Sequence, residues 1–277
     1  MSDSLSSPAG LWAGIAAFAY LAATFKTWLA LRTGSLSAQE LKRLVLTGSM
    51  LAVTLHTLAL YYALFQPTGL VLGWGNAVSL FAWQAAFIFS ILVFAYPLEV
   101  LGLLVLPFGA LSALIGLWMQ GNSTPIRLDW TIQLHALLSI IAYGLITLAA
   151  AQALLLSIQT NRLQHNKAGG FLSALPPIQT METALFRMLV SGYALLCLAV
   201  LSGVLFVDNL FAQHLAHKTV LSFIALAVFG VLLWGRWRHG WRGKRALRLI
   251  LGGYCSLVLA YFGSKFVLEL ILQRHWT

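Results

Sequence analysis

Eight apolar segments follow one another along the chain, separated by shorter polar stretches. Each is close to the roughly 20 residues that an α-helix needs to cross the hydrocarbon core of a membrane. None shows the strict alternation of apolar and polar residues that a lipid-facing barrel strand requires. The pattern therefore predicts an all-α, polytopic transmembrane bundle of about eight helices. The predicted spans are 11–31, 44–65, 77–94, 98–117, 132–156, 186–207, 217–234 and 249–272.

The connections between the segments vary in length. Only the turn 95–97, which contains a proline, separates the third and fourth segments, so we expect a tight helical hairpin. A single kinked helix, and hence seven spans, is the alternative. The longest polar stretch, 159–183, contains Gly-Gly and Pro-Pro pairs and lacks apolar periodicity, which predicts a loop with little structure. The chain, 1–277, has no visible repeat and is interpreted as one integral-membrane domain.

The composition supports a membrane protein. Hydrophobic residues make up 60% of the chain and charged residues 9%, with a mean hydropathy of +0.86, whereas soluble domains carry about a quarter charged residues. The net charge of +10 does not indicate nucleic-acid binding, because the cations lie in loops where membrane orientation accounts for them. We therefore expect a bilayer, and no nucleic acid, around this chain.

The positions of the basic residues predict the orientation. Of the 17 Lys and Arg residues, 13 lie in or beside the connections between spans one and two, five and six, and seven and eight. Three lie on the opposite side, and Lys265 lies inside the last span. The positive-inside rule then places both termini on the side of the membrane that faces away from the cytoplasm. No basic residue precedes the first segment, so we expect a retained helix rather than a cleaved signal peptide.

Three histidines are the candidates for chemistry inside the membrane. His135 lies about one and a half turns into the fifth span, and His217 begins the seventh, so both are expected near the outer face. His56 lies about nine residues, roughly 14 Å, from the outer end of the second span, nearer the midplane. Intramembrane ionisable residues are commonly functional. The alternative for each histidine is a structural role, in which the ring hydrogen-bonds to a neighbouring helix or is hydrated at the membrane surface.

Haem suits such histidines for a physical reason. Its macrocycle is apolar and its propionates are anionic, so imidazoles from two helices can hold the iron while the propionates reach polar surroundings. Lys218 or Arg127 could receive the propionates at the outer face. Ordinary snorkelling of these cations is the alternative.

Two polar loops have two interpretations each. Asp208-Asn209, between spans six and seven, could orient a histidine ring or cap a helix. The connection 235–248 alternates cations with tryptophans and could bind anionic lipid head groups or a cytoplasmic partner, although membrane orientation alone explains such a cluster.

Motifs for other chemistry are missing. Cys197 and Cys255 lie in separate apolar segments and form no metal-spaced or redox pair, and no C-x-x-C-H motif for covalent haem is present. The chain also lacks a Walker loop, H-E-x-x-H, G-x-S-x-G and any pair of carboxylates within the spans. No constellation supports an enzymatic activity.

Several stretches together resemble a known family. The run from Leu134 to Tyr143 matches the pattern L-H-x-x-x-S-x-x-x-Y of the CcsA-type cytochrome c biogenesis family. Further stretches are similar to its YpjD subgroup of bacterial inner-membrane proteins. These are Asp208-Asn209-Leu210-Phe211, His217-Lys218-Thr219-Val220-Leu221-Ser222, Leu233-Trp234-Gly235, Gly240-Trp241-Arg242-Gly243-Lys244-Arg245 and Tyr261-Phe262-Gly263-Ser264-Lys265, and Asn76-Ala77-Val78-Ser79 resembles a helix-starting segment of the family.

The resemblance implies an eight-helix bundle that handles haem at the outer face of the membrane. In that family, histidines flank a tryptophan-rich W-W-D loop, and the histidine that begins the relevant helix matches His135. The loop between spans six and seven lacks that motif here, and Ser264-Lys265 stands where a second external histidine is expected. The resemblance therefore implies haem binding more than haem delivery, with His217 as a substitute ligand.

Three hypotheses follow from the sequence. The first is a protein related to cytochrome c assembly that binds b-type haem non-covalently through His135, paired with His217 or His56, alongside other assembly subunits. The second is a transporter in which the histidines and Lys265 line a polar path. The third is an accessory or structural subunit of a membrane complex that has no haem.

Overall fold

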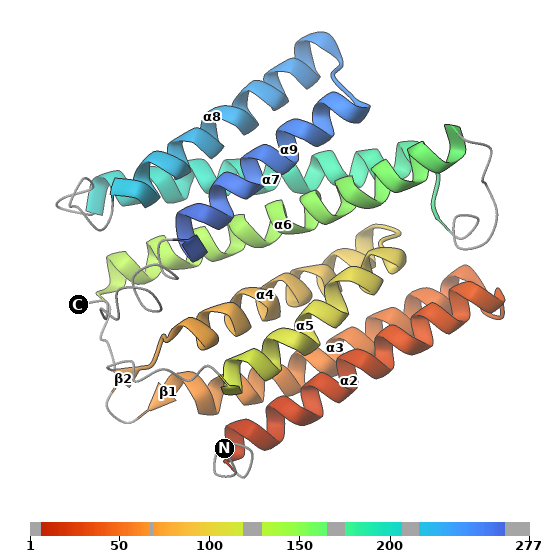
Figure 1. The fold of residues 1–277 in the computed structure, drawn as a ribbon, viewed down its shortest axis with the longest axis vertical. Coiled ribbons are helices and arrows are strands. Elements are labelled where there is room, and N and C mark those ends of the chain that lie inside the picture. The colour runs from red at the N-terminus through yellow and green to blue at the C-terminus, as the bar shows by residue number, and fades with distance from the viewer. Residues whose placement is uncertain (1–6, 67–68, 119–128, 165–174, 207–215, 264–277) are drawn as a thin grey trace. The chain divides into compact units, whose positions relative to one another are not determined.

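The computed structural model describes residues 7–66, 69–118, 129–164, 175–206 and 216–263 (Figure 1). These residues form eight α-helices, a 3-10 turn and a π-helical turn. The helices are α2 (Pro8–Thr33), α3 (Ala38–Leu64), α4 (Trp74–Ala95), η1 (Glu99–Leu101), α5 (Gly102–Trp118), α6 (Trp130–Gln164), α7 (Ile178–Phe206), α8 (Ala216–His239), α9 (Gly243–Val258) and η3 (Leu259–Gly263).

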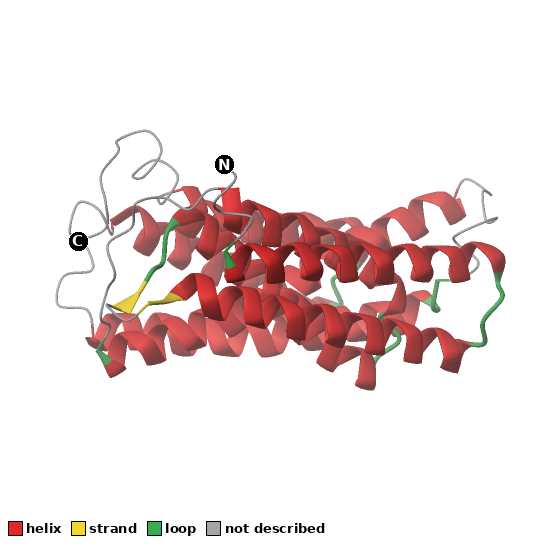
Figure 2. Ribbon diagram, turned by 90° about the horizontal axis from the view of Figure 1, so that it is seen from below, coloured by secondary structure: helices red, strands yellow, loops and turns green. Residues whose placement is uncertain are grey.

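The all-α fold is confirmed, with a helix at each of the eight predicted segments. Seven of the described helices are long and apolar enough to cross a membrane. The eighth predicted span, 249–272, is described only as far as Gly263. Figure 2 shows the two strands found among the described residues, β1 (Phe65–Gln66) and β2 (Gly69–Leu70), which form a short antiparallel pair.

Two predictions about connections have different outcomes. The hairpin at 95–97 is confirmed, because α4 ends at Ala95 and η1 leads directly into α5. The loop predicted for 159–183 is wrong at both ends, since α6 continues to Gln164 and α7 begins at Ile178. The proline pair stands just before α7, where a missing N–H costs nothing, and the Pro177 carbonyl accepts the bonds of Thr180 and Met181.

The chain divides into two compact units, which are described separately. Unit 1 comprises Met1–Arg127 and Arg162–Met181, and unit 2 comprises Leu128–Asn161 and Glu182–Thr277. The prediction of one membrane domain stays a prediction.

Unit 1 is built on α2, α3, α4 and α5. The helix α2 packs on α3 and α5, and α4 packs on the same two helices. Small residues allow this approach: a Cβ on Gly48 would lie 2.9 Å from the Cβ of Ala23, and one on Gly109 would lie 3.0 Å from the Tyr20 ring. Within a membrane the hydrophobic effect does not favour contact between helices, because lipid tails are as apolar as the side chains. Close van der Waals packing at small residues stabilises the association instead.

The turn between α2 and α3 is held by local hydrogen bonds. Gly34 ends α2 in the left-handed conformation, with φ 61°, and donates its N–H to Ala30. Ser37 and Glu40 form a reciprocal capping box at the start of α3. These contacts explain why so short a connection reverses the chain.

Unit 2 contains most of α6 and of α7, together with α8, α9 and η3. A Cβ on Gly192 of α7 would lie 2.8 Å from Ile146 of α6, and one on Gly253 of α9 would lie 2.7 Å from the Phe229 ring of α8. The α6 start, α7 end, α8 start and η3 therefore share one end of this unit, and the opposite end holds the α8–α9 turn.

Candidate functional site

His135 lies in the second turn of α6 and reaches across to α7. Its Nδ1 lies 2.9 Å from the backbone oxygen of Ala199 and 3.0 Å from the hydroxyl of Ser202. Gly203 makes room for the ring, because a Cβ there would lie 3.2 Å from the His135 Cε1. The side chain is half-buried, and its contacts with α7 fix the orientation of the ring.

The contact with Ala199 determines the tautomer of His135. A carbonyl oxygen only accepts hydrogen bonds, so Nδ1 carries the proton and donates it. Nε2 then keeps its lone pair, and it has no protein hydrogen-bond partner among the described residues. Metal-ligating histidines typically hold their second nitrogen in this way, bonded to a backbone carbonyl.

Other family-like stretches converge on the same end of unit 2. Lys218 of α8 lies 5.5 Å from the Tyr261 ring of η3, and its charge acts on His135. The Tyr261 ring in turn lies 6.4 Å from that of Tyr143 on α6, and the Tyr143 hydroxyl is hydrogen-bonded to Ser222 of α8. Residues about 130 positions apart in the sequence thus gather around the beginning of α6.

Several predicted residues have no described side chain. His217 lies in the first turn of α8, directly before Lys218, and only its backbone is described. Arg127, Asp208, Asn209 and Lys265 lie outside the described residues.

His56 occupies a different environment, in unit 1. It is fully buried on α3, with Nε2 2.9 Å from the Ser79 hydroxyl of α4 and Nδ1 3.4 Å from the Tyr20 hydroxyl of α2. Both ring nitrogens are therefore engaged by protein groups. The adjoining cavity, lined by Ser79 and Asn76, measures about 10 Å³, which is about the space of one water molecule.

Sequence reasoning missed the partners of both histidines. Ser202 and Ala199 sit in an apolar run of α7, and Tyr20 sits in one of α2. Ser79 belongs to the family-like segment, which was the one available signal. Gly73 holds the N-cap position of α4, and the Asn76 amide donates to the Val71 carbonyl, at 3.1 Å.

No group of three His, Cys, Asp or Glu side chains that could hold a metal ion occurs among the described residues. A haem iron takes only one or two axial ligands from the protein, because the macrocycle supplies the rest. His135, with Nε2 open, has the donor chemistry that such an iron uses.

Comparisons with known proteins agree with the motifs. Residues 44–272 match the family described as Cytochrome C assembly protein. The chain is 35% identical over 175 residues to Inner membrane protein YpjD of Escherichia coli K12, covering 61% of this chain and 66% of that protein. The match thus spans slightly less than two thirds of the relative's length.

Two further relatives match smaller parts of the chain. A 28.8 kDa protein of Azospirillum brasilense is 35% identical over 143 residues, covering 51% of this chain and 53% of the relative. Cytochrome c biogenesis protein CcsA of Gloeobacter violaceus is 22% identical over 100 residues, covering 35% of this chain and 30% of the relative. No solved structure matches the chain.

Proposed function

Because the chain belongs to the cytochrome c assembly protein family, we propose that it binds b-type haem non-covalently, with the Nε2 of His135 as an axial ligand to the iron. The observation that carries this proposal is the hydrogen bond from Nδ1 to the Ala199 carbonyl, at 2.9 Å. It directs a neutral imidazole with its lone pair on Nε2, the form in which histidine binds iron.

The place of action follows from the same proposal. The apolar helices and the printed name of the E. coli relative support a multi-pass protein of the bacterial inner membrane. The distribution of cations supports an outward-facing α6 start, which puts His135 near the periplasmic surface. Haem handling at that surface is the function we assign, in company with other assembly subunits.

Lys218 is the residue proposed to receive a haem propionate. Its ammonium group lies 5.5 Å from the Tyr261 ring of η3, at the same end of unit 2 as His135, and an ammonium group forms charge-assisted hydrogen bonds with carboxylates. The site thereby supplies both an iron ligand and a cation. His217, one residue earlier on α8, is proposed as the second ligand.

His56 is a weaker candidate for a ligand than His217. Iron binding at either of its ring nitrogens would break a buried hydrogen bond to Ser79 or Tyr20. Leaving such a hydroxyl unpaired costs roughly 1–3 kcal/mol.

The alternative function is a membrane subunit or transporter without haem. The buried chain Tyr20–His56–Ser79 favours this alternative, because a polar connection between three apolar helices is a common feature of transport paths. The same experiment separates the two functions.

The test is the absorption spectrum of the protein purified in mild detergent, oxidised and dithionite-reduced, with haem quantified as the pyridine haemochrome. We expect near-stoichiometric haem in the wild-type protein and a large loss in His135→Ala. His239→Ala, an exposed histidine at the opposite end of unit 2, is the matched control and should keep its haem. A colourless protein that takes up no added haem would leave the alternative in place.

A further inference from the structure

A groove opens at the end of unit 2 opposite His135. It has a volume of about 40 Å³ and lies between the end of α6 and the beginnings of α7 and α9. Its walls are largely apolar, with Leu156, Leu185 and Ile250 among them, whereas Thr160, Asn161 and Lys244 supply polar groups. The groove thus combines apolar walls with a cationic rim.

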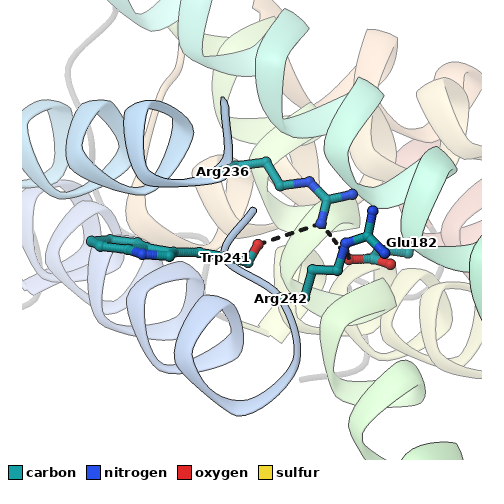
Figure 3. Close-up of polar contacts among 4 residues, drawn as sticks. All are labelled: Glu182, Arg236, Trp241 and Arg242. Atoms are coloured by element: carbon teal, nitrogen blue, oxygen red, sulfur yellow. Dashed lines mark hydrogen bonds and ion pairs between the residues drawn. The ribbon is translucent and has the colours of Figure 1, made fainter. Parts of the chain in front are cut away.

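The one carboxylate in the lining is already neutralised. The Glu182 Oε1 lies 2.8 Å from the Arg236 Nη1 and 3.6 Å from the Arg242 Nε (Figure 3). The two guanidinium groups approach it from either side of the α8–α9 turn, and Arg236 also donates to the Trp241 carbonyl, at 3.4 Å. Two cations share one anion here, so a positive charge remains at the rim.

Further positive charge surrounds this rim. The Arg242 side chain is 66% exposed, which leaves its outer donors directed to the surroundings. Lys244 follows in the first turn of α9, a turn with no acidic residue and no side-chain cap on its N–H groups. Cations and backbone donors at a helix start both favour an anion.

The size and chemistry of the groove select the ligand. A volume of about 40 Å³ holds a few methylene groups of an acyl chain, whose remainder would lie in the surrounding lipid, and it does not hold a helix from a partner. A free phosphate ion would use the cations and gain nothing from the apolar walls. A phospholipid with a net negative charge uses both the cations and the apolar walls, because it carries a phosphate and an acyl chain in one molecule. The groove lies at a helix end, where the lipid head groups of a membrane are found.

We propose that this groove is a binding site for one anionic phospholipid. The phosphodiester lies at the rim, against Lys244 and Arg242, and an acyl chain lies along the wall that contains Leu156 and Ile250. The site differs from general attraction of a basic loop to the membrane, because it requires the cations at the rim, Lys244 and Arg242, rather than any cation near the α8–α9 turn. It does not depend on haem binding.

The experiment is a lipid titration of the delipidated full-length protein by native mass spectrometry. Dioleoyl phosphatidylglycerol is compared with dioleoyl phosphatidylcholine, which has the same chains but no net charge. We expect one phosphatidylglycerol to bind at least several-fold more tightly. Lys244→Gln should weaken that binding about fivefold, equivalent to about 1 kcal/mol for one cation near a lipid phosphate.

Arg238→Gln is the matched control, because it removes the same charge from an exposed position in the last turn of α8 that does not line the groove. Its affinity for phosphatidylglycerol should stay within about twofold of the wild type. Equal losses in Lys244→Gln and Arg238→Gln would show diffuse attraction and overturn the site.

Two further measurements complete the test. Leu156→Gln, which changes only the wall, should also weaken phosphatidylglycerol binding, and Lys244→Arg should restore it if Lys244→Gln folds poorly. Inorganic phosphate at millimolar concentration should not displace the lipid. Displacement by phosphate, or equal binding of phosphatidylcholine, would contradict the proposal.

Discussion

His135 and His56 both lie in apolar helices, but they differ in the hydrogen bonding of their ring nitrogens. One nitrogen of His135 is bonded to a carbonyl and the other has no protein partner among the described residues. Both nitrogens of His56 contact hydroxyl groups. An imidazole nitrogen holds either a hydrogen bond or a metal, so of these two histidines only His135 can bind a metal without losing a hydrogen bond.

Gly203→Ala should reduce haem content without unfolding the protein. The added methyl would lie 3.2 Å from the His135 Cε1, so the ring must tilt and the direction of Nε2 changes. Alanine is also a better helix former than glycine, by roughly 1 kcal/mol, so thermal stability should hold or rise. The measurement is the haem-to-protein ratio together with the melting temperature.

Gly252→Ala is the control for that prediction. A Cβ at Gly252 meets nothing within 4 Å, so this variant gains the same helix propensity without touching His135. If both variants keep equal haem, the packing of Gly203 against the ring does not position the ligand.

Ser79→Ala should destabilise the protein, although the substitution removes only one hydroxyl group. It leaves the buried Nε2 of His56 without its 2.9 Å partner, at a cost of about 1–3 kcal/mol. Unfolding in detergent, followed by circular dichroism, measures the loss. Ser112→Ala is equally buried but removes only a bond within its own helix, and should cost less; equal costs would argue against an interhelical role for His56.

At the scale of the helices, Glu182 connects three elements. It lies on α7, pairs with Arg236 of α8 and also contacts Arg242, which precedes α9. The Arg236 and Glu182 side chains are 24% and 12% exposed, whereas Arg242 is 66% exposed. Solvent therefore screens the second contact much more than the first.

A double-mutant cycle should separate the two contacts. The coupling energy between Glu182→Gln and Arg236→Gln is expected at about 1–3 kcal/mol, as for a close pair with little solvent access. The coupling between Glu182→Gln and Arg242→Gln is expected below about 1 kcal/mol, as for exposed pairs. The free energy of unfolding in detergent gives both values, and the reverse order would contradict the geometry.

The helices were predictable from sequence, but their contacts were not. Length and hydropathy locate each helix, because the membrane demands about 20 apolar residues whatever the neighbours are. The identity of Ser79 or Ser202 as a histidine partner depends on how two helices are rotated against each other, which no local pattern encodes. His135 was selected because it is an ionisable residue inside an apolar span, and the family pattern around it added to that choice. The C-terminal end of α6 and the N-terminal end of α7 were missed, because the prolines and polar residues near these helix termini are also typical of loops.

At the scale of the whole chain, the open question with the clearest test is orientation. The cations predict that the α2–α3 turn faces the cytoplasm. In a background with Cys197→Ala and Cys255→Ala, Ser35→Cys in that turn should resist a membrane-impermeant maleimide in intact cells. Trp130→Cys, exposed at the start of α6, should react. Labelling of Ser35→Cys with protection of Trp130→Cys would invert the topology and the proposed periplasmic haem site.

The close helix contacts also limit how this sequence can evolve. A side chain at Gly48 would meet Ala23 at 2.9 Å and one at Gly253 would meet the Phe229 ring at 2.7 Å, whereas Gly14 has nothing within 4 Å. Positions such as Gly48 and Gly253 can change only together with the residue across the interface. Related sequences should therefore vary freely at Gly14, whereas substitutions at Gly48 and Gly253 should be accompanied by substitutions at the facing residues of α2 and α8.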